Sequence, residues 1–153
     1  MGTVLAPLAL LANGITVGIM VSTVIGIAPM MLSLSYERYV QTVQFLWPRY
    51  DPVMPLSNGM TVLLDLVLAL AVPNNIARAG FAAAAMLLLC VMAISITKNV
   101  PVNRYVKSLD PASEPANWSQ RDPRRRWRAW NTTRTSVALL AFVTNILATV
   151  RLG

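Results

Sequence analysis

The fold is decided by the first 36 residues, MGTVLAPLALLANGITVGIMVSTVIGIAPMMLSLSY (1–36), which include no charged side chain. A helix needs about 20 predominantly apolar residues to cross the hydrocarbon core of a bilayer, and this stretch is longer than that. Residues 79–97 and 135–150 also lack charge, and a fourth apolar stretch, residues 55–73, holds one charged side chain, Asp65. The pattern predicts four membrane-spanning helices.

The composition of the chain agrees with this prediction. Its 153 residues make about one domain, 56% of them are hydrophobic and 12% are charged, about half the charged share of a soluble domain. A soluble protein of this size could not bury so much apolar side chain. We expect a single all-α domain over residues 1–153, a membrane-embedded four-helix bundle with helices at about 4–32, 55–72, 79–97 and 123–150.

The first apolar stretch differs from a cleaved secretory signal. Such a signal has a positive n-region and a short apolar core, whereas no basic residue lies near Met1 and the apolar run is too long. We expect a retained first helix.

Lysine and arginine are segregated around the expected helices. Eleven of them fall in the loops at 33–54 and 98–131 or at Arg134, and the opposite side has only Arg78 and Arg151. Because basic loops stay in the cytoplasm, we expect an integral protein of the cell (plasma) membrane with both loops cytoplasmic and both termini outside.

The net charge of +7 and the run Arg124–Arg126 invite comparison with a nucleic-acid-binding patch. Basic residues beside a membrane helix are better explained by topology and by contact with anionic headgroups. We therefore expect the lipid bilayer, and no nucleic acid, as a partner, with Arg124, Arg125 and Arg128 turned toward headgroups.

The residue inventory narrows the chemistry. The chain has no histidine, and its only cysteine is Cys90, so histidine general-base chemistry and an intramolecular disulfide are excluded. The sequence contains no phosphate loop, dinucleotide fingerprint, nucleophile elbow or metal-ligand spacing. No metal and no bound cofactor are predicted.

Asp65 is the sharpest candidate for a functional residue. A carboxylate at membrane depth usually faces the bundle interior with a partner and is functional by default. It would accept a proton or orient a substrate or an arginine. The structural alternative is an interhelical hydrogen bond that fixes packing.

Helix four carries an aromatic and polar stripe. Its members lie three or four residues apart and share one face: Trp127, Trp130, Asn131, Arg134, Ala138, Ala141 and Asn145. We favour an inward Arg134, paired with Asp65 or bound to an enolate or phenolate oxygen, over snorkelling to the interface. Trp127 and Trp130 fit either an interfacial belt or flat walls for an aromatic ligand.

A short repeat is visible in the two expected loops. Residues 37–41, ERYVQ, resemble residues 103–107, NRYVK, and each follows an apolar helix and a proline, Pro29 or Pro101. This pattern would fit two helix–loop–helix halves in parallel orientation.

Two segments resemble the DUF1772 family, the small membrane proteins that include the fungal anthrone oxygenases. They are residues 97–104, TKNVPVNR, and residues 126–135, RWRAWNTTRT. The family pattern is Pro-x-Asn after the third helix and then Trp, a polar residue and Arg in the fourth, which Pro101, Asn103, Trp127, Asn131 and Arg134 fit. The segment DPVMP (51–55) is also similar to the family.

The resemblance implies oxidation of an activated aromatic or polyketide substrate by molecular oxygen, without a bound cofactor. Family members often carry histidine near the position of Asn131. This chain has none, so a histidine-dependent mechanism does not transfer.

The leading hypothesis is a membrane-bound oxygenase for an electron-rich apolar aromatic molecule. Asp65 would generate a carbanion or enolate, and Arg134, Asn103 and Asn131 would stabilise the oxyanion. Substrate contacts are expected from Trp127, Trp130, Asn99 and Tyr39. The alternative is a non-catalytic accessory or binding protein or a small carrier, and whether the chain forms a homo-oligomer stays open.

Overall fold

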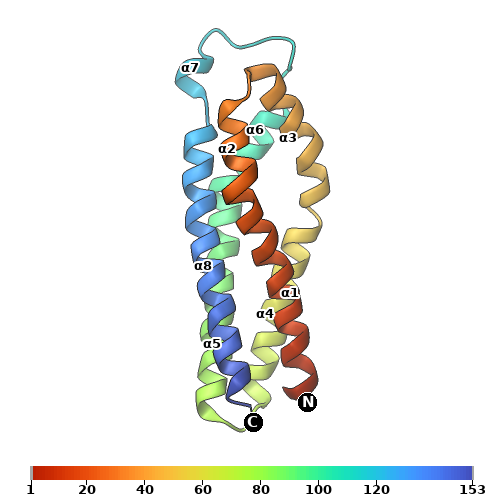
Figure 1. Cartoon of the computed structure of the whole chain (residues 1–153), viewed down its shortest axis with the longest axis vertical. Coiled ribbons are helices and arrows are strands. Elements are labelled where there is room, and N and C mark those ends of the chain that lie inside the picture. The colour runs from red at the N-terminus through yellow and green to blue at the C-terminus, as the bar shows by residue number, and fades with distance from the viewer. Residues whose placement is uncertain (1, 153) are drawn as a thin grey trace.

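The computed structural model describes residues 2–152, and these form an all-α bundle of four long rods without a strand (Figure 1). Each rod is built from consecutive helical segments. They are α1 (Gly2–Ser22), the π-helical turn η1 (Thr23–Ile27) and α2 (Ala28–Ser33); α3 (Tyr36–Tyr50) and α4 (Val53–Ala71); α5 (Asn75–Ile94), the π-helical turn η2 (Ser95–Asn99) and α6 (Val100–Lys107); and α7 (Trp118–Arg121) and α8 (Arg124–Val150).

All four rods are long and apolar enough to cross a membrane: Gly2–Ser33, Tyr36–Ala71, Asn75–Lys107 and Trp118–Val150. Many of their large apolar side chains face outward, including Leu11, Leu63, Leu70 and Leu147. Lipid is the medium in which such a surface is stable. The chain is therefore an integral membrane protein.

The rods are longer than the sequence indicated, because the expected loop at 33–54 is mostly helix α3. The buried residues of α3 are Tyr36, Tyr39, Val40 and Val43, which follow the spacing of one helical face. Most of the other positions in its first two turns are polar, among them Glu37, Arg38 and Gln41. A search for uncharged apolar runs misses such an amphipathic helix, and the same holds for α6 inside the expected loop at 98–131.

The most extensive helix–helix contact in the bundle is between α5 and α8. Both helices bury small side chains, among them Ala84 and Ala85 on α5 and Ala141 on α8. A Cβ atom on Gly80 would lie 2.8 Å from Cβ of Ala148. Since small residues allow helix backbones to approach in membranes, Gly80 sets the separation of these two helices.

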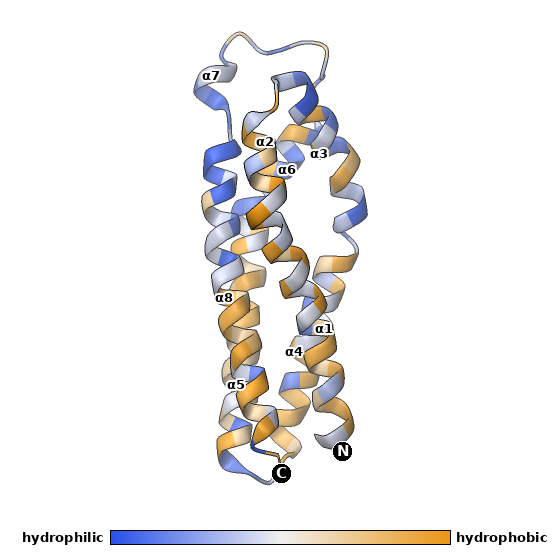
Figure 2. Cartoon of the chain, in the orientation of Figure 1, coloured by the Kyte–Doolittle hydropathy of each residue, from blue (hydrophilic) through white to orange (hydrophobic). Residues whose placement is uncertain are grey.

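The two ends of the bundle differ in polarity. The N- and C-termini and the turn between α4 and α5 lie at one end, and the hydrophilic segments α3, α7 and the start of α8 gather at the other (Figure 2). This distribution is the one that the predicted topology requires. Which end faces the cytoplasm stays a prediction.

The two π-helical turns occupy matching places in the first and third rods. Thr23 starts η1 and Ser95 starts η2, and a proline follows six residues after each start, at Pro29 and Pro101. Proline has no N–H for the carbonyl one turn earlier, so the helix reorganises just before it. The match adds a structural counterpart to the short sequence repeat.

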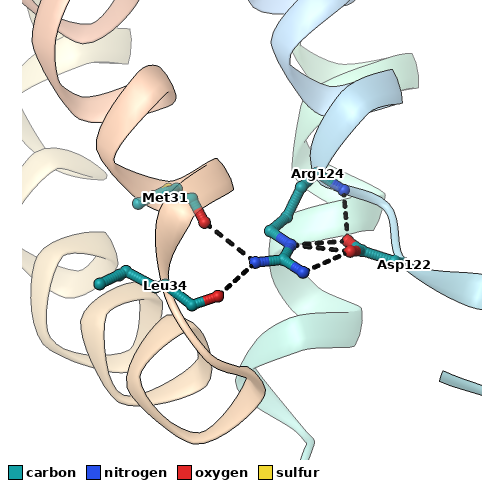
Figure 3. A network of polar contacts seen from close by, with 4 residues as sticks. All are labelled: Met31, Leu34, Asp122 and Arg124. Carbon is teal, nitrogen blue, oxygen red and sulfur yellow. Dashed lines mark hydrogen bonds and ion pairs between the residues drawn. The ribbon is translucent and has the colours of Figure 1, made fainter. Parts of the chain in front are cut away.

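Arg124 ties the start of α8 to the end of α2 (Figure 3). Its Nη1 donates to the carbonyl oxygens of Met31 at 3.1 Å and Leu34 at 2.7 Å, and its Nη2 lies 2.6 Å from Oδ2 of Asp122. Arg124 was expected to face headgroups, and that expectation was wrong. The sequence could not show that two carbonyls at the end of α2 would come within its reach.

Candidate active site

A cavity of about 160 Å³ lies in the half of the bundle that contains η1 and η2. All four rods line it, and most of its wall is apolar, including Ile19, Met20, Ile27, Met92 and Ile96. The residues on the wall with polar side-chain groups are few: Thr23, Trp47, Tyr50, Asp51, Asn58, Ser95, Trp127 and Arg134. An apolar pocket with a few convergent polar groups is the usual form of a small-molecule site.

Arg134 is the only basic residue on this wall, and its guanidinium is held from two sides. Its Nε and Nη2 donate to Oδ1 of Asn131 at 3.0 and 2.8 Å, and its Nη1 donates to Oγ of Ser95 at 2.9 Å. These bonds use three of the five N–H groups of the side chain. Two N–H groups remain for a ligand.

No carboxylate neutralises Arg134. Within residues 2–152 the single ion pair joins Arg124 to Asp122. Both groups that hold Arg134 are neutral, so its positive charge is retained in a largely apolar wall. A positive charge in such surroundings attracts an anion strongly, because the low local dielectric strengthens the interaction.

Two further polar groups on the wall have no hydrogen-bond partner in the part of the chain that the structure describes. Nε1 of Trp127 and Oδ1 of Asn58 are buried and make no hydrogen bond among the described residues. Buried polar groups are normally paired. Trp127 therefore has one unused donor and Asn58 one unused acceptor at the cavity.

The π-helical turns place two of the wall's hydroxyl groups. Ser95 is the first residue of η2, and Thr23 is the first residue of η1. Such turns are frequent at functional sites because they break the regular helical direction of side chains. Here η2 aligns the Ser95 hydroxyl with Arg134.

Tyr50 and Asp51 come from the junction of α3 and α4, and sequence reasoning missed both as site residues. Asp51 is exposed and is the single carboxylate among the cavity residues. The sequence signal was present in the family-like segment 51–55, but that segment was assigned to a loop and its acid was not connected to Arg134.

The predicted pair of Asp65 and Arg134 is not formed. Asp65 is fully buried on α4, and its Oδ2 accepts a hydrogen bond from Nδ2 of Asn145 at 3.0 Å. Asn145 lies eleven residues after Arg134 on α8, which is about 16 Å along the axis at 1.5 Å per residue. Asp65 does not line the cavity.

The other predicted residues have mixed positions. Trp127 lines the cavity, and Asn131 supports Arg134 without lining it. Asn99 and Asn103 are buried nearby, with Nδ2 of Asn99 bonded to the carbonyl of Trp127 at 3.4 Å.

Trp130 and Tyr39 lie outside the cavity wall. Trp130 has the ammonium of Lys98 5.1 Å from its ring centre, which fits the interfacial alternative. Tyr39 packs against Trp118 with ring centres 6.1 Å apart, so it belongs to the packing of the polar end of the bundle.

The donor set for a metal is sparse. Nowhere in residues 2–152 do three side chains of the types His, Cys, Asp and Glu come together. Asp51 alone represents these types on the cavity wall.

The fold and the cavity define a small integral membrane protein with a largely apolar internal cavity that has one arginine on its wall. Residues 45–144 match the family described as Anthrone oxygenase, so the chain belongs to that family, as the sequence resemblance indicated. The match runs from the end of α3 into α8 and includes Trp127, Arg134 and Asp51. No curated protein and no solved structure matches the chain.

Proposed function

We propose that the protein is a membrane-embedded oxygenase that uses molecular oxygen to oxidise an electron-rich, anthrone-like aromatic substrate in the cavity beside Arg134. The observation that carries the proposal is the uncompensated guanidinium of Arg134, fixed by Asn131 and Ser95 on an otherwise apolar wall. Membership in the anthrone oxygenase family supports the reaction class.

The proposed chemistry begins with loss of a proton from a CH₂ group that is conjugated to an aromatic ketone. The resulting enolate, or phenolate, places negative charge on the former carbonyl oxygen. The two free N–H groups of Arg134 and the indole N–H of Trp127 would hold this oxygen. Fixed donors aimed at a developing oxyanion are often the largest single contribution to catalysis.

We assign the proton-accepting role to Asp51 rather than to Asp65. Asp51 lines the cavity. Asp65 is hydrogen-bonded to Asn145, which lies about three helical turns from Arg134 along α8. The exposure of Asp51 at the junction of α3 and α4 gives the accepted proton a route to water.

The balanced reaction converts R₂CH₂ and O₂ to R₂C=O and H₂O. The deprotonated carbon is oxidised and forms a C–O bond with dioxygen, giving a hydroperoxide after protonation. Loss of water then breaks the O–O bond and leaves the ketone. Dioxygen is the only oxidant, and we propose that neither a metal nor an organic cofactor takes part.

The size and position of the cavity agree with an apolar substrate that arrives through the bilayer. An engineered apolar cavity of about 150 Å³ holds benzene, so about 160 Å³ accommodates roughly one ring in this conformation. A fused tricyclic substrate would also occupy the open side of the cavity.

The test is oxygen uptake by the purified protein in detergent or nanodiscs with an anthrone as substrate. The proposal predicts one O₂ consumed and one anthraquinone formed per anthrone, above the spontaneous rate, with a large loss in Asp51→Asn. Metal analysis and chelator treatment of the same sample test the cofactor assignment. Binding of the substrate without turnover would support the alternative of a binding or accessory protein.

A further inference from the structure

A second buried polar site lies away from the cavity, where three helices meet. Asn13 of α1, Asp65 of α4 and Asn145 of α8 are all 0% exposed. Apolar core residues surround them on their own helices, such as Ala9 before Asn13 and Leu68 after Asp65. Asp65 and Asn145 are hydrogen-bonded to each other, and Asn13 is a third fully buried polar side chain in the apolar part of the bundle.

Most polar atoms of these three side chains have no partner among the described residues. The one hydrogen bond runs from Nδ2 of Asn145 to Oδ2 of Asp65. Oδ1 of Asp65, Oδ1 of Asn145 and both polar atoms of Asn13 make none among the described residues. Three oxygen atoms are therefore without a partner. The unused donors of the three side chains are the two N–H groups of Asn13 and the second N–H of Asn145, and none of them carries a positive charge that would balance the carboxylate.

The helix register brings these atoms toward one another. A Cβ atom on Gly14 would lie 3.6 Å from Cε2 of Phe142, so Gly14 and Phe142 lie at about the same level of the bundle. Asn13 is next to Gly14, and Asn145 is three residues after Phe142. Asn13 and Asn145 are therefore about one helical turn apart along the bundle axis. Side chains lean toward the N-terminus of their helix. Because α1 runs opposite to α4 and α8, Asn13 leans toward the level of Asp65 and Asn145, and these two lean back toward it.

Among the described residues Asp65 makes no ion pair. The helices α1 and α4 carry no other charged residue, Arg134 of α8 lies eleven residues before Asn145, and Arg151, six residues after Asn145, is exposed. The basic residue of α5 is Arg78. It is exposed, and its Nε–H donates a hydrogen bond to the carbonyl oxygen of Ala69 at 3.0 Å. An ionised carboxylate without a partner is strongly disfavoured at membrane depth.

We propose that Asn13, Asp65 and Asn145 form a binding site for one small monovalent cation, a hydron or a sodium ion, held on the free oxygen of Asp65. One positive charge neutralises one carboxylate. A hydron would make Asp65 a donor to an amide oxygen. A sodium ion would take the three free oxygens as ligands, which suit a hard cation. The site is independent of the proposed oxidation.

Infrared spectroscopy at neutral pH tests the hydron. Exposed carboxylates are ionised there, so a C=O stretch of a carboxylic acid that shifts in D₂O would report a protonated buried group. The band should vanish in Asp65→Asn and persist in Glu114→Gln, whose side chain is exposed. If Asp65→Asn does not fold, the band of the wild-type protein and its shift in D₂O still test for a protonated buried carboxylic acid.

Thermal unfolding tests the sodium ion. If sodium occupies the site, replacing choline chloride by sodium chloride at constant ionic strength should raise Tm by about 2–4 °C. Glu114→Gln should retain the shift and Asp65→Asn should lose it. The acid band identifies a hydron, and the sodium-specific shift identifies sodium. A wild-type protein with neither an acid band nor a sodium-dependent Tm would overturn the proposal.

Discussion

Arg134 donates two hydrogen bonds to the same side-chain oxygen, Oδ1 of Asn131, one turn earlier on α8. A buried guanidinium usually pairs with a carboxylate, and here a neutral amide takes that place. Asn131 therefore orients Arg134 without cancelling its charge. The arrangement keeps the guanidinium ready for an anionic ligand.

Changing Asn131→Asp should weaken binding of a phenolate ligand about tenfold or more, equivalent to about 1.4 kcal/mol. A carboxylate at this place would pair with Arg134 and compete with the ligand. Fluorescence titration of the purified protein with a hydroxyanthraquinone measures the dissociation constant. Thr132→Asp adds the same charge on an exposed neighbouring position and should leave the constant unchanged. Equal affinity in both variants would contradict the role assigned to Asn131.

Changing Gly80→Ala should destabilise the bundle by about 1–3 kcal/mol, although alanine favours a helix more than glycine does. The added Cβ would meet Cβ of Ala148 at 2.8 Å, so α5 and α8 would have to separate. Gly59→Ala is the matched control, because nothing lies within 4 Å of its new Cβ. Thermal unfolding in detergent should give a lower Tm for the first variant and an equal or higher Tm for the second. A fall in both would show that helix separation is not the cause.

Changing Arg124→Met should loosen the end of the bundle that Figure 3 shows. The carbonyls of Met31 and Leu34 would lose their donor, and Asp122 would lose its ion pair. Hydrogen exchange should accelerate at residues 31–36 and remain unchanged in α5. Arg125→Met removes an exposed neighbouring arginine and should have no such effect. An unchanged exchange rate at residues 31–36 in Arg124→Met would contradict the conclusion that Arg124 ties α8 to the end of α2.

The orientation in the membrane is open to a labelling test. In a Cys90→Ala background, Asn75→Cys places a thiol at the first residue of α5, and Ser113→Cys places one between α6 and α7; both positions are exposed. We predict that the arginine-rich end faces the cytoplasm, so a membrane-impermeant maleimide should label only the first position in intact cells. Labelling of only the second would reverse the topology.

The sequence allowed prediction of the four spans because uncharged apolar length is a local property. It also predicted an inward Arg134, because the 3.6-residue period of α8 places it on the face of Trp127 and Asn131. The partner of Asp65, which is Asn145 and not Arg134, could not be predicted in the same way. It depends on the relative depth of α4 and α8, and two residues on one buried face can pair with quite different levels of a neighbouring helix.

Asp51 was missed for a related reason. Residues 36–50 have too many polar side chains to be recognised as part of an apolar span, so α3 was taken as a loop. Only the observed continuation of α3 into α4 brings Tyr50 and Asp51 to the cavity. Amphipathic periodicity in the segment, with Tyr36, Tyr39, Val40 and Val43 on one face, was the signal that could have revealed it.

The most direct test of the central claim compares the oxygen-uptake rate of Arg134→Gln with that of Arg128→Gln in the anthrone assay. Arg128 is an exposed arginine on the same helix, so the pair separates the cavity guanidinium from the general loss of positive charge. We predict that Arg134→Gln lowers kcat about 10²–10³-fold, the usual loss for one oxyanion donor, and that Arg128→Gln retains the wild-type rate. Full activity in folded Arg134→Gln protein would contradict the proposal that oxidation takes place beside Arg134.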